Sequence, residues 1–257
     1  MGTVAADADA PADARAAEGR ARFTAWWSGR SLDASFPEPL LERPVVEVAR
    51  GLLGARLVCT VGSERVTCVV VETEAYAGAD DPASHAATVR GRTHRSRAMF
   101  GPAGHAYVYR SYGVHWCMNV VTGPEGVAQA VLIRGVEPVE GEDLMTRRRG
   151  GRTPLGAGPG RVCAALGVTD ALYGHDLREP PLVLSAGWAV PDELAGVSRR
   201  VGVSAATNWP YRFYVRGSAG VSRPDGWGAS GFDPRMQDAA PARRTSRRRR
   251  TPTHRRG

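Results

Sequence analysis

The sequence predicts an α+β fold, in which a single mixed domain of strands and helices lies between two tails. The first observation is the order of the patterns: stretches with the two-residue alternation of strands and stretches with helical spacing follow one another without a regular strand–helix–strand order. The second is length, because 257 residues suit one sizeable domain with tails, or at most two small domains. The third is that 42% of the residues are hydrophobic, which is enough for a core.

The elements can be predicted in order along the chain. Apolar residues at helical spacing predict a helix over 45–53 that ends at Gly54. A turn at Gly62-Ser63 separates two runs rich in β-branched residues. Pro159 is typical of a first helical turn. The remaining patterns predict strands over 55–61 and 65–76, loop or short helix over 78–97, a strand over 105–113 ending in a tight turn, paired strands over 115–123 and 128–138, helices over 140–149 and 158–168, and a last strand over 212–217.

The two ends of the chain differ in composition from its middle. Residues 1–35 and 222–257 are predicted to be disordered tails around a domain over 36–221. The last fifteen residues, 243–257, hold eight arginines and no acidic residue, so they carry the whole net charge of +8. Such a run is typical of an arm that binds nucleic acid without sequence preference.

Several classes of protein are disfavoured by the composition. No apolar run approaches the roughly 20 residues that span a bilayer, and the acidic, Ala-rich N-terminus is unlike a secretory signal. We therefore expect a soluble cytoplasmic protein, associated with the nucleoid if it is bacterial. The four cysteines stand singly among apolar neighbours, which predicts buried reduced thiols. The HExxH, GxGxxG and GxxxxGK[ST] motifs are absent, so the sequence predicts neither a metal nor a cofactor.

One internal segment has a composition suited to nucleic acid. Residues 82–124 contain no acidic side chain. Basic groups interleaved with aromatic rings suit contact with phosphates and stacking on bases. Composition alone leaves open a second interpretation, in which solvated arginines lie above tyrosines that pack in the core. The side chains concerned are Arg90, Arg92, Arg95, Arg97, Arg110, His85, His94, His105, His115, Tyr107, Tyr109 and Tyr112.

The octapeptide VVVETEAY, residues 69–76, is the first candidate for chemistry. In a strand, Glu72, Glu74 and Tyr76 point to one face. An apolar run that becomes acidic at its end indicates a buried strand that opens into a polar cleft, where a carboxylate can act as a general base. The alternative is that both glutamates lie on a solvated strand edge.

The run HAYVYRSYG supplies three aromatic candidates. Tyr107 and Tyr109 share one face of a strand, where core packing is the ordinary role. Tyr112 precedes Gly113 and is expected at a turn tip, where it either wedges into a base stack or covers its own hairpin.

Three further polar residues need partners or a polar pocket. Asn119 and Arg134 lie within apolar strand patterns, and buried polar groups are hydrogen-bonded. His85 stands where the acid-free segment begins. Each can be structural, and each can line a pocket.

The order of the motifs resembles the alkyladenine (3-methyladenine) DNA glycosylase family. The resemblance covers about residues 36–217, and the motifs that carry it are LLGARLV, VETEAYAGADDPASHA, GRTHRSRAMFGPAGHAYVYRSYGVHWCMNVV, AVLIRGVEP and GPGRVCAALGV. It implies a single domain around a curved antiparallel sheet, similar to a formyltransferase C-terminal domain, with a protruding hairpin that inserts into the DNA minor groove. It also implies base flipping, a monomer, and double-stranded DNA with a damaged purine as partner.

The resemblance assigns roles to the catalytic and pocket residues. Glu74 matches the general base that deprotonates the attacking water, and Arg134 matches the residue that helps hold this water. The side chains implied to line the base pocket are Tyr76, His85, Tyr107, Tyr109 and Asn119, of which Tyr76 and Tyr109 match the walls that sandwich the base and Asn119 matches the residue that rejects the exocyclic amine of guanine.

The DNA-binding residues carry over with two departures. Tyr112 matches the intercalating wedge. His115 stands where some relatives have an aromatic residue beside the wedge, and Arg161 stands where relatives can carry lysine, so the details of groove binding are open. The residues expected to contact the DNA backbone are Arg92, Arg95, Arg97 and Arg161.

The absence of lysine from the sequence bears on the reaction, since all 34 basic residues other than histidine are arginine. A glycosylase that also cleaves the strand needs an amine nucleophile to form a Schiff base. The N-terminal amine is the one candidate left, and it belongs to a segment that is expected to be disordered and far from the site, so we expect base removal alone. The expected substrates are alkylated or deaminated purines: 3-methyladenine, 7-methylguanine, hypoxanthine and ethenoadenine. The competing hypotheses are a lesion sensor without catalysis, which would need no carboxylate at Glu74, and another nucleic-acid enzyme of similar fold, such as an RNA-processing hydrolase or a formyl-transfer-type domain.

Overall fold

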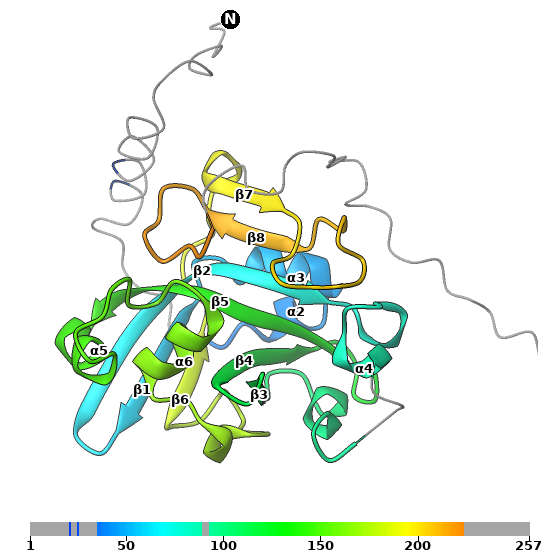
Figure 1. Ribbon diagram of the computed structural model, residues 1–257, viewed down its shortest axis with the longest axis horizontal. Coiled ribbons are helices and arrows are strands. Elements are labelled where there is room, and N and C mark those ends of the chain that lie inside the picture. The colour runs from blue at the N-terminus through cyan, green and yellow to red at the C-terminus, as the bar shows by residue number, and fades with distance from the viewer. Residues whose placement is uncertain (1–20, 22–24, 26–34, 89–92, 224–257) are drawn as a thin grey trace, which may run out of the picture.

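The computed structural model describes residues 35–88 and 93–223, together with Ala21 and Ala25. Figure 1 shows an open sheet with helices on both sides. The elements in chain order are α2 (Glu38–Leu41), α3 (Val45–Gly51), β1 (Arg56–Val61), β2 (Glu64–Tyr76), η1 (Gly78–Asp80), α4 (His85–Thr88), η2 (Arg97–Phe100), β3 (Ala106–Ser111), β4 (His115–Thr122), β5 (Gln129–Glu140), α5 (Glu142–Arg148), α6 (Pro159–Leu166), η3 (Asp170–Leu172), β6 (Leu182–Ser185), η4 (Asp192–Leu194), β7 (Ala195–Ser198) and β8 (Arg212–Val215).

The strands of this part of the chain form one eight-stranded antiparallel sheet centred on β2. Its main order is β3-β4-β5-β2-β1-β6. β2 is 13 residues long and pairs with β5 along one edge. On its other edge, β1 pairs with the first half of β2, as far as Val69, and β8 pairs with Glu72–Glu74. The second half of β2 therefore lies between β5 and β8, with neighbours on both sides.

An irregularity in β2 lies at Glu72. The pairing of β2 with β5 shifts register on both sides of this residue, which lies opposite Gly135. Gly135 has no room for a side chain, because a Cβ atom there would lie 2.8 Å from the Cβ of Glu72 and would meet the carbonyl oxygen of Gly220. Register shifts of this kind bend a strand and redirect its side chains.

The helices cover two faces of the sheet. On one face, the hydroxyl of Thr73 in β2 donates a hydrogen bond of 2.7 Å to the carbonyl of Ala49 in α3. On the other, the thiol of Cys59 in β1 lies 3.0 Å from the carbonyl oxygen of Leu166 in α6. Figure 1 shows α5 and α6 in front of the sheet, with α2 and α3 behind it. Since side chains alternate along a strand, Glu74 shares the face of α6, opposite that of Thr73.

The predicted elements agree with the structure along most of the chain. The strands expected over 55–76, 105–138 and 212–217 and the helices expected over 45–53, 140–149 and 158–168 are present, with ends moved by a few residues. The four cysteines are free and buried, as predicted. The short strands β6 and β7 and the single-turn helix α2 were not predicted. Each has only four residues, which is too short for a periodic pattern to stand out.

The tight turn between β3 and β4 lies at the surface. The tip residue Tyr112 is 92% exposed and adopts a left-handed backbone conformation, with φ of 49°. No helix in the described part of the chain is both long enough and apolar enough to cross a membrane.

Candidate active site

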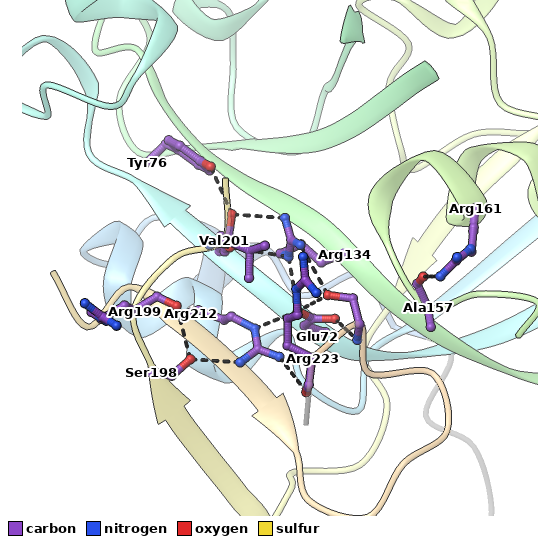
Figure 2. A network of polar contacts seen from close by, with 12 residues as sticks. Glu72, Tyr76, Arg134, Ala157, Arg161, Ser198, Arg199, Val201, Arg212 and Arg223 are labelled. Carbon is purple, nitrogen blue, oxygen red and sulfur yellow. Dashed lines mark hydrogen bonds and ion pairs between the residues drawn. The ribbon is translucent and has the colours of Figure 1, made fainter. Parts of the chain in front are cut away.

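Glu74 lies fully buried near the end of β2. One carboxylate oxygen, Oε1, accepts a 2.7 Å hydrogen bond from the backbone N–H of Val201. The other, Oε2, accepts a 2.9 Å hydrogen bond from the hydroxyl of Tyr76. The guanidinium of Arg134 is farther away, with Nε 3.3 Å from Oε1 and Nη1 3.4 Å from Oε2 (Figure 2). The short bonds fix the carboxylate, and the long contacts to Arg134 are those that a water molecule would most readily replace.

A second buried glutamate, Glu72, lies on the same side of β2. Its Oε1 accepts hydrogen bonds from Nε of Arg134 at 3.1 Å and from Nε of Arg212 at 2.7 Å. Ser222 donates its hydroxyl to Oε1 at 2.8 Å and its backbone N–H to Oε2 at 2.6 Å. Figure 2 shows Arg134 and Arg212 converging on Glu72 from β5 and β8. Arg134 thus lies between two carboxylates.

The two glutamates titrate differently. Burial raises the pKa of Glu74 above the ordinary value, because the charge of Arg134 only partly offsets it and the like charge of Glu72 adds to it. Burial also acts on Glu72, but Arg134 and Arg212 overcome it and lower the pKa of that carboxyl. Burial, and then the charge of Glu74, raise the pKa of Tyr76, so its hydroxyl remains a donor. Carboxyls whose surroundings separate their pKa values are typical of acid–base sites.

An ion pair under the site positions the segment that holds Glu74. The side chains of Arg200 and Asp81 are fully buried, and Nη2 of Arg200 lies 2.8 Å from Oδ1 of Asp81. The guanidinium carbon of Arg200 also lies 4.8 Å from the ring centroid of Tyr76. The next residue, Val201, donates its N–H to Glu74. The pair therefore supports both the backbone donor and the tyrosine that contact the carboxylate.

A cavity of about 540 Å³ lies above this group. This volume falls within the roughly 300–1,000 Å³ that is usual for small-ligand sites. Glu74 lies behind Tyr76, Arg134 and Val201, all of which line the cavity. The structure brings the pocket residues predicted from the sequence together around this cavity: Tyr76, His85, Tyr107, Tyr109, Asn119 and Arg134.

The aromatic wall of the cavity comes from β3 and α4. The rings of Tyr107 and Tyr109 are stacked with centroids 5.4 Å apart, and His85 meets Tyr109 edge-on at 4.5 Å. Nδ1 of His85 lies 2.9 Å from the hydroxyl of Tyr107. Burial, and then the positive charge of Arg95, lower the pKa of His85, so this ring is neutral at pH 7. Tyr107 is almost wholly buried and supports the wall from behind, which agrees with a core role.

Asn119 lies on β4 at the floor of the cavity. It is buried, and its amide nitrogen donates a 3.0 Å hydrogen bond to the backbone carbonyl of Tyr107. This bond fixes the orientation of the amide group, as is usual for a buried polar side chain.

One of the predicted DNA-binding arginines, Arg95, lines the cavity. It is exposed and places its guanidinium carbon 5.6 Å from the ring centroid of Tyr109. Arg97 is exposed, with its guanidinium carbon 5.9 Å from the ring of Tyr173. Arg92 lies outside the described residues.

Two other predicted DNA contacts lie in the β3–β4 turn and on α6. Tyr112 lines the cavity at the exposed turn. Arg161 is exposed on α6, and its Nη1 donates a 2.7 Å hydrogen bond to the carbonyl of Ala157 (Figure 2). The first turn of α6 packs against the foot of the β3–β4 turn, since a Cβ atom on Gly160 would lie 2.9 Å from the Cβ of His115.

Sequence reasoning did not find the side chains that support Arg134 and Glu74 from outside the motif. Glu72 was recognised as a neighbour of Glu74 but given no role. Ser222 lies one residue beyond the expected domain end. Arg212, Arg200 and Asp81 gave no signal, because their partners are up to 140 positions away in sequence. Within the described residues, no three His, Cys, Asp or Glu side chains gather as metal ligands would.

The fold and the cavity together define a class of protein. An aromatic cavity that can hold a planar ring, above a buried carboxylate beside an arginine, is typical of an enzyme that attacks a bond to a flat heterocycle. Its rim carries arginines that suit a phosphate-bearing ligand.

Comparison with known proteins identifies the family. Residues 39–219 match the model of the methylpurine-DNA glycosylase (MPG) family. A protein of Methanoculleus marisnigri named for 3-methyladenine DNA glycosylase is 49% identical over 196 residues, which cover 74% of this chain and 99% of the relative. Two relatives with the same name match as well. The protein of Agrobacterium fabrum is 46% identical over 76% of this chain and 95% of the relative, and that of Frankia casuarinae is 47% identical over 71% of this chain and 90% of the relative. The chain belongs to the methylpurine-DNA glycosylase family.

Proposed function

We propose that this protein is a monofunctional DNA glycosylase that hydrolyses the N-glycosidic bond of alkylated or deaminated purines in double-stranded DNA and thereby begins base excision repair. The observation that carries the proposal is a buried glutamate of raised pKa beside Arg134, beneath an aromatic cavity. Membership of the family supports the reaction class. The proposed substrates are 3-methyladenine, 7-methylguanine, hypoxanthine and ethenoadenine, handled by a monomer without a cofactor.

The reaction replaces the base by water at the C1′ atom of the sugar. As the base departs, the sugar develops positive charge. Ionised Glu74 takes the proton of the attacking water and stabilises this charge, while Arg134 orients the water. A general base typically contributes about 10²–10⁴ in rate, and fixed charges aimed at the developing cation add to this. A raised pKa suits the task, because a base is most effective when its pKa is near the working pH.

The aromatic wall selects bases that stack well. A flipped purine placed between Tyr76 and Tyr109 gains about 1–3 kcal/mol of stacking. An alkylated purine that carries positive charge gains further attraction to the ring faces. The neutral state of His85 favours this attraction, since a charged imidazolium in the same wall would repel a cationic base.

Base flipping requires a group that fills the gap in the duplex. Tyr112 is the candidate, since this residue is 92% exposed at the tip of the β3–β4 turn, so packing within its own fold does not explain an aromatic side chain there. Flipping costs a few kcal/mol, and costs least for damaged or mismatched bases. Arg95, which lines the cavity, and Arg161, which is exposed on α6, would bind the backbone phosphates near the flipped nucleotide.

The proposed enzyme leaves an intact abasic site. Strand cleavage by β-elimination needs an amine that forms a Schiff base, and the sequence holds no lysine. Borohydride trapping on an abasic substrate is therefore expected to give no covalent complex, and strand breaks are expected only after alkali.

The test is single-turnover excision from duplexes that carry one lesion. Wild type is expected to release the base, and Glu74→Gln is expected to bind the lesion but to excise it at least about 10²-fold more slowly. Glu140→Gln is the matched control. Glu140 accepts a hydrogen bond from Thr67, which lies on β2 like Glu74, but Glu140 does not line the cavity. Tight lesion binding without excision by wild type would favour a sensor, and excision from a ribonucleotide substrate alone would favour an RNA enzyme.

A further inference from the structure

The guanidinium of Arg134 contacts two carboxylates. Its Nε lies 3.1 Å from Glu72 and 3.3 Å from Glu74, so neither carboxylate has sole use of the charge. The terminal nitrogens divide in the same way: Nη1 faces Glu74 at 3.4 Å, and Nη2 donates to the hydroxyl of Ser222 at 3.2 Å. The guanidinium has hydrogen-bond partners on both sides and is 6% exposed as a whole residue.

Glu72 is the better anchored of the two carboxylates. It is held from three elements: Arg134 on β5, Arg212 on β8, and the segment at Ser222. Arg212 is itself fixed, since its Nη1 donates a 2.8 Å hydrogen bond to the hydroxyl of Ser198. Glu72 is fully buried and does not itself line the cavity. Its bonds thus serve to hold Arg134 and the chain around it.

The other charged groups near Glu74 are balanced among themselves. On β2 itself, Tyr76 donates its hydroxyl to Glu74 and stays protonated. The adjoining loop brings Arg200, but Asp81 binds that guanidinium through two hydrogen bonds. Arg134 and Glu72 are therefore the charges that decide how basic Glu74 is.

We propose that Glu72 is a positioning residue of the base-removal reaction: it holds Arg134 and takes up part of its charge, so that Arg134 can orient the attacking water without neutralising Glu74. The proposal rests on the proposed function of Glu74 as the base. Without Glu72, the guanidinium would pair with the one remaining carboxylate. Glu74 would then be a weaker base, and Arg134 would no longer be fixed in the position from which it is proposed to orient the attacking water.

The test compares Glu72→Gln with wild type in single-turnover excision across pH. The acidic limb of the rate profile is expected to move to lower pH by about one unit or more, because Glu74 loses a like charge and gains a closer cation. The plateau rate is expected to fall by about ten- to a hundredfold, the cost of a displaced catalytic group. A second measurement does not depend on activity. In ¹³C NMR of labelled glutamate carboxyls, with the Glu74 signal assigned by its loss in Glu74→Gln, the titration midpoint of Glu74 should move to lower pH in Glu72→Gln as well.

A matched control separates this role from simple loosening of the chain. Glu137 on β5 accepts hydrogen bonds of 2.7 and 2.9 Å from Ser218 and Gly220, in the segment that also carries Ser222, but Glu137 forms neither a hydrogen bond nor an ion pair with Arg134. Glu137→Gln is expected to leave the acidic limb where it is in wild type. If it reproduces the Glu72→Gln profile, the effect arises from the segment and the proposal is wrong.

The remaining outcomes also decide the question. A folded Glu72→Gln protein whose rate falls equally at every pH, with an unmoved NMR midpoint, overturns the proposal while leaving the glycosylase assignment intact. If wild type excises no lesion, the function fails, and the NMR titration still tests the effect of Glu72 on Glu74. If Glu72→Gln does not fold, Ser222→Ala is used, which keeps every charge and removes one hydroxyl between Glu72 and Arg134. Excision is then expected to fall about three- to tenfold at unchanged lesion affinity, and an unchanged rate counts against the proposal.

Discussion

Replacing Asp81 by Asn is expected to destabilise the fold and to slow excision together. Asp81 and Arg200 have fully buried side chains, so the variant leaves a buried guanidinium without a balancing charge. Breaking such a pair from one side costs about 3–5 kcal/mol, a large share of the roughly 5–15 kcal/mol that stabilises a folded protein. With a urea m value of about 2 kcal/mol/M, the unfolding midpoint should fall by about 2 M.

The effect on the reaction follows from the neighbour of Arg200. Val201 donates its backbone N–H to Glu74 at 2.7 Å, so displacement of Arg200 moves a direct partner of the base. Single-turnover excision under conditions where the variant is folded should fall by about ten- to a hundredfold. The control is Asp192→Asn: that carboxylate bonds Arg50 at 2.7 Å, but its side chain is fully exposed, and we expect no measurable change. Equal urea midpoints for the two variants would refute the reasoning.

Three further predictions concern the DNA-binding surface and the base. Tyr112→Ala should change stability by less than about 0.5 kcal/mol, since the residue is 92% exposed, but should slow excision from a duplex more than from a single strand; equal slowing on both would argue against a wedge. Wild-type excision should rise with pH to a half-point above the ~4.3 of an ordinary glutamate, because Glu74 acts only when ionised and burial raises its pKa; a half-point at or below that value would exclude it as the titrating base. Arg161→Ala should reduce the slope of log affinity against log salt by about 1. The control is Arg147→Ala, which should leave the slope unchanged, because the guanidinium of Arg147 already bonds Glu64 at 2.8 Å. Equal slopes in the two variants would contradict a phosphate contact at Arg161.

The sequence predicted the fold where residues that are close along the chain determine it. The β1–β2 and β4–β5 pairs follow from two runs with a turn between them, and the structure confirms both. The pairing of β8 with Glu72–Glu74 joins positions about 140 residues apart, and no local pattern specifies it. The register shift at Glu72 could not be predicted from the sequence either, since it depends on the close approach of Gly135 and Gly220.

The same distinction applies to the candidate site. Glu74 and Tyr76 stand in one motif, so their proximity to one another could be predicted from strand geometry. Arg134 could be predicted as a site residue because it is a polar residue within an apolar strand pattern and because it matches a family motif. The partners that orient these residues, Arg200 and Ser222, belong to segments with ordinary composition. Their role depends on hydrogen bonds that exist only once the sheet has formed.

The charges around the cavity favour a cationic base over a neutral one. Among the described residues that line it, only Arg95 and Arg134 carry positive charge, since His85 has a lowered pKa. Glu72 and Glu74 of β2 balance the charges of Arg134 and Arg212, and Arg95 is exposed at the cavity, where a DNA phosphate can neutralise it. The remaining wall presents the faces of aromatic rings such as Tyr109. A methylated purine with positive charge therefore gains cation–π attraction that a normal purine lacks. A neutral lesion such as hypoxanthine gains only stacking, so its selection must depend more on how easily it leaves the base pair.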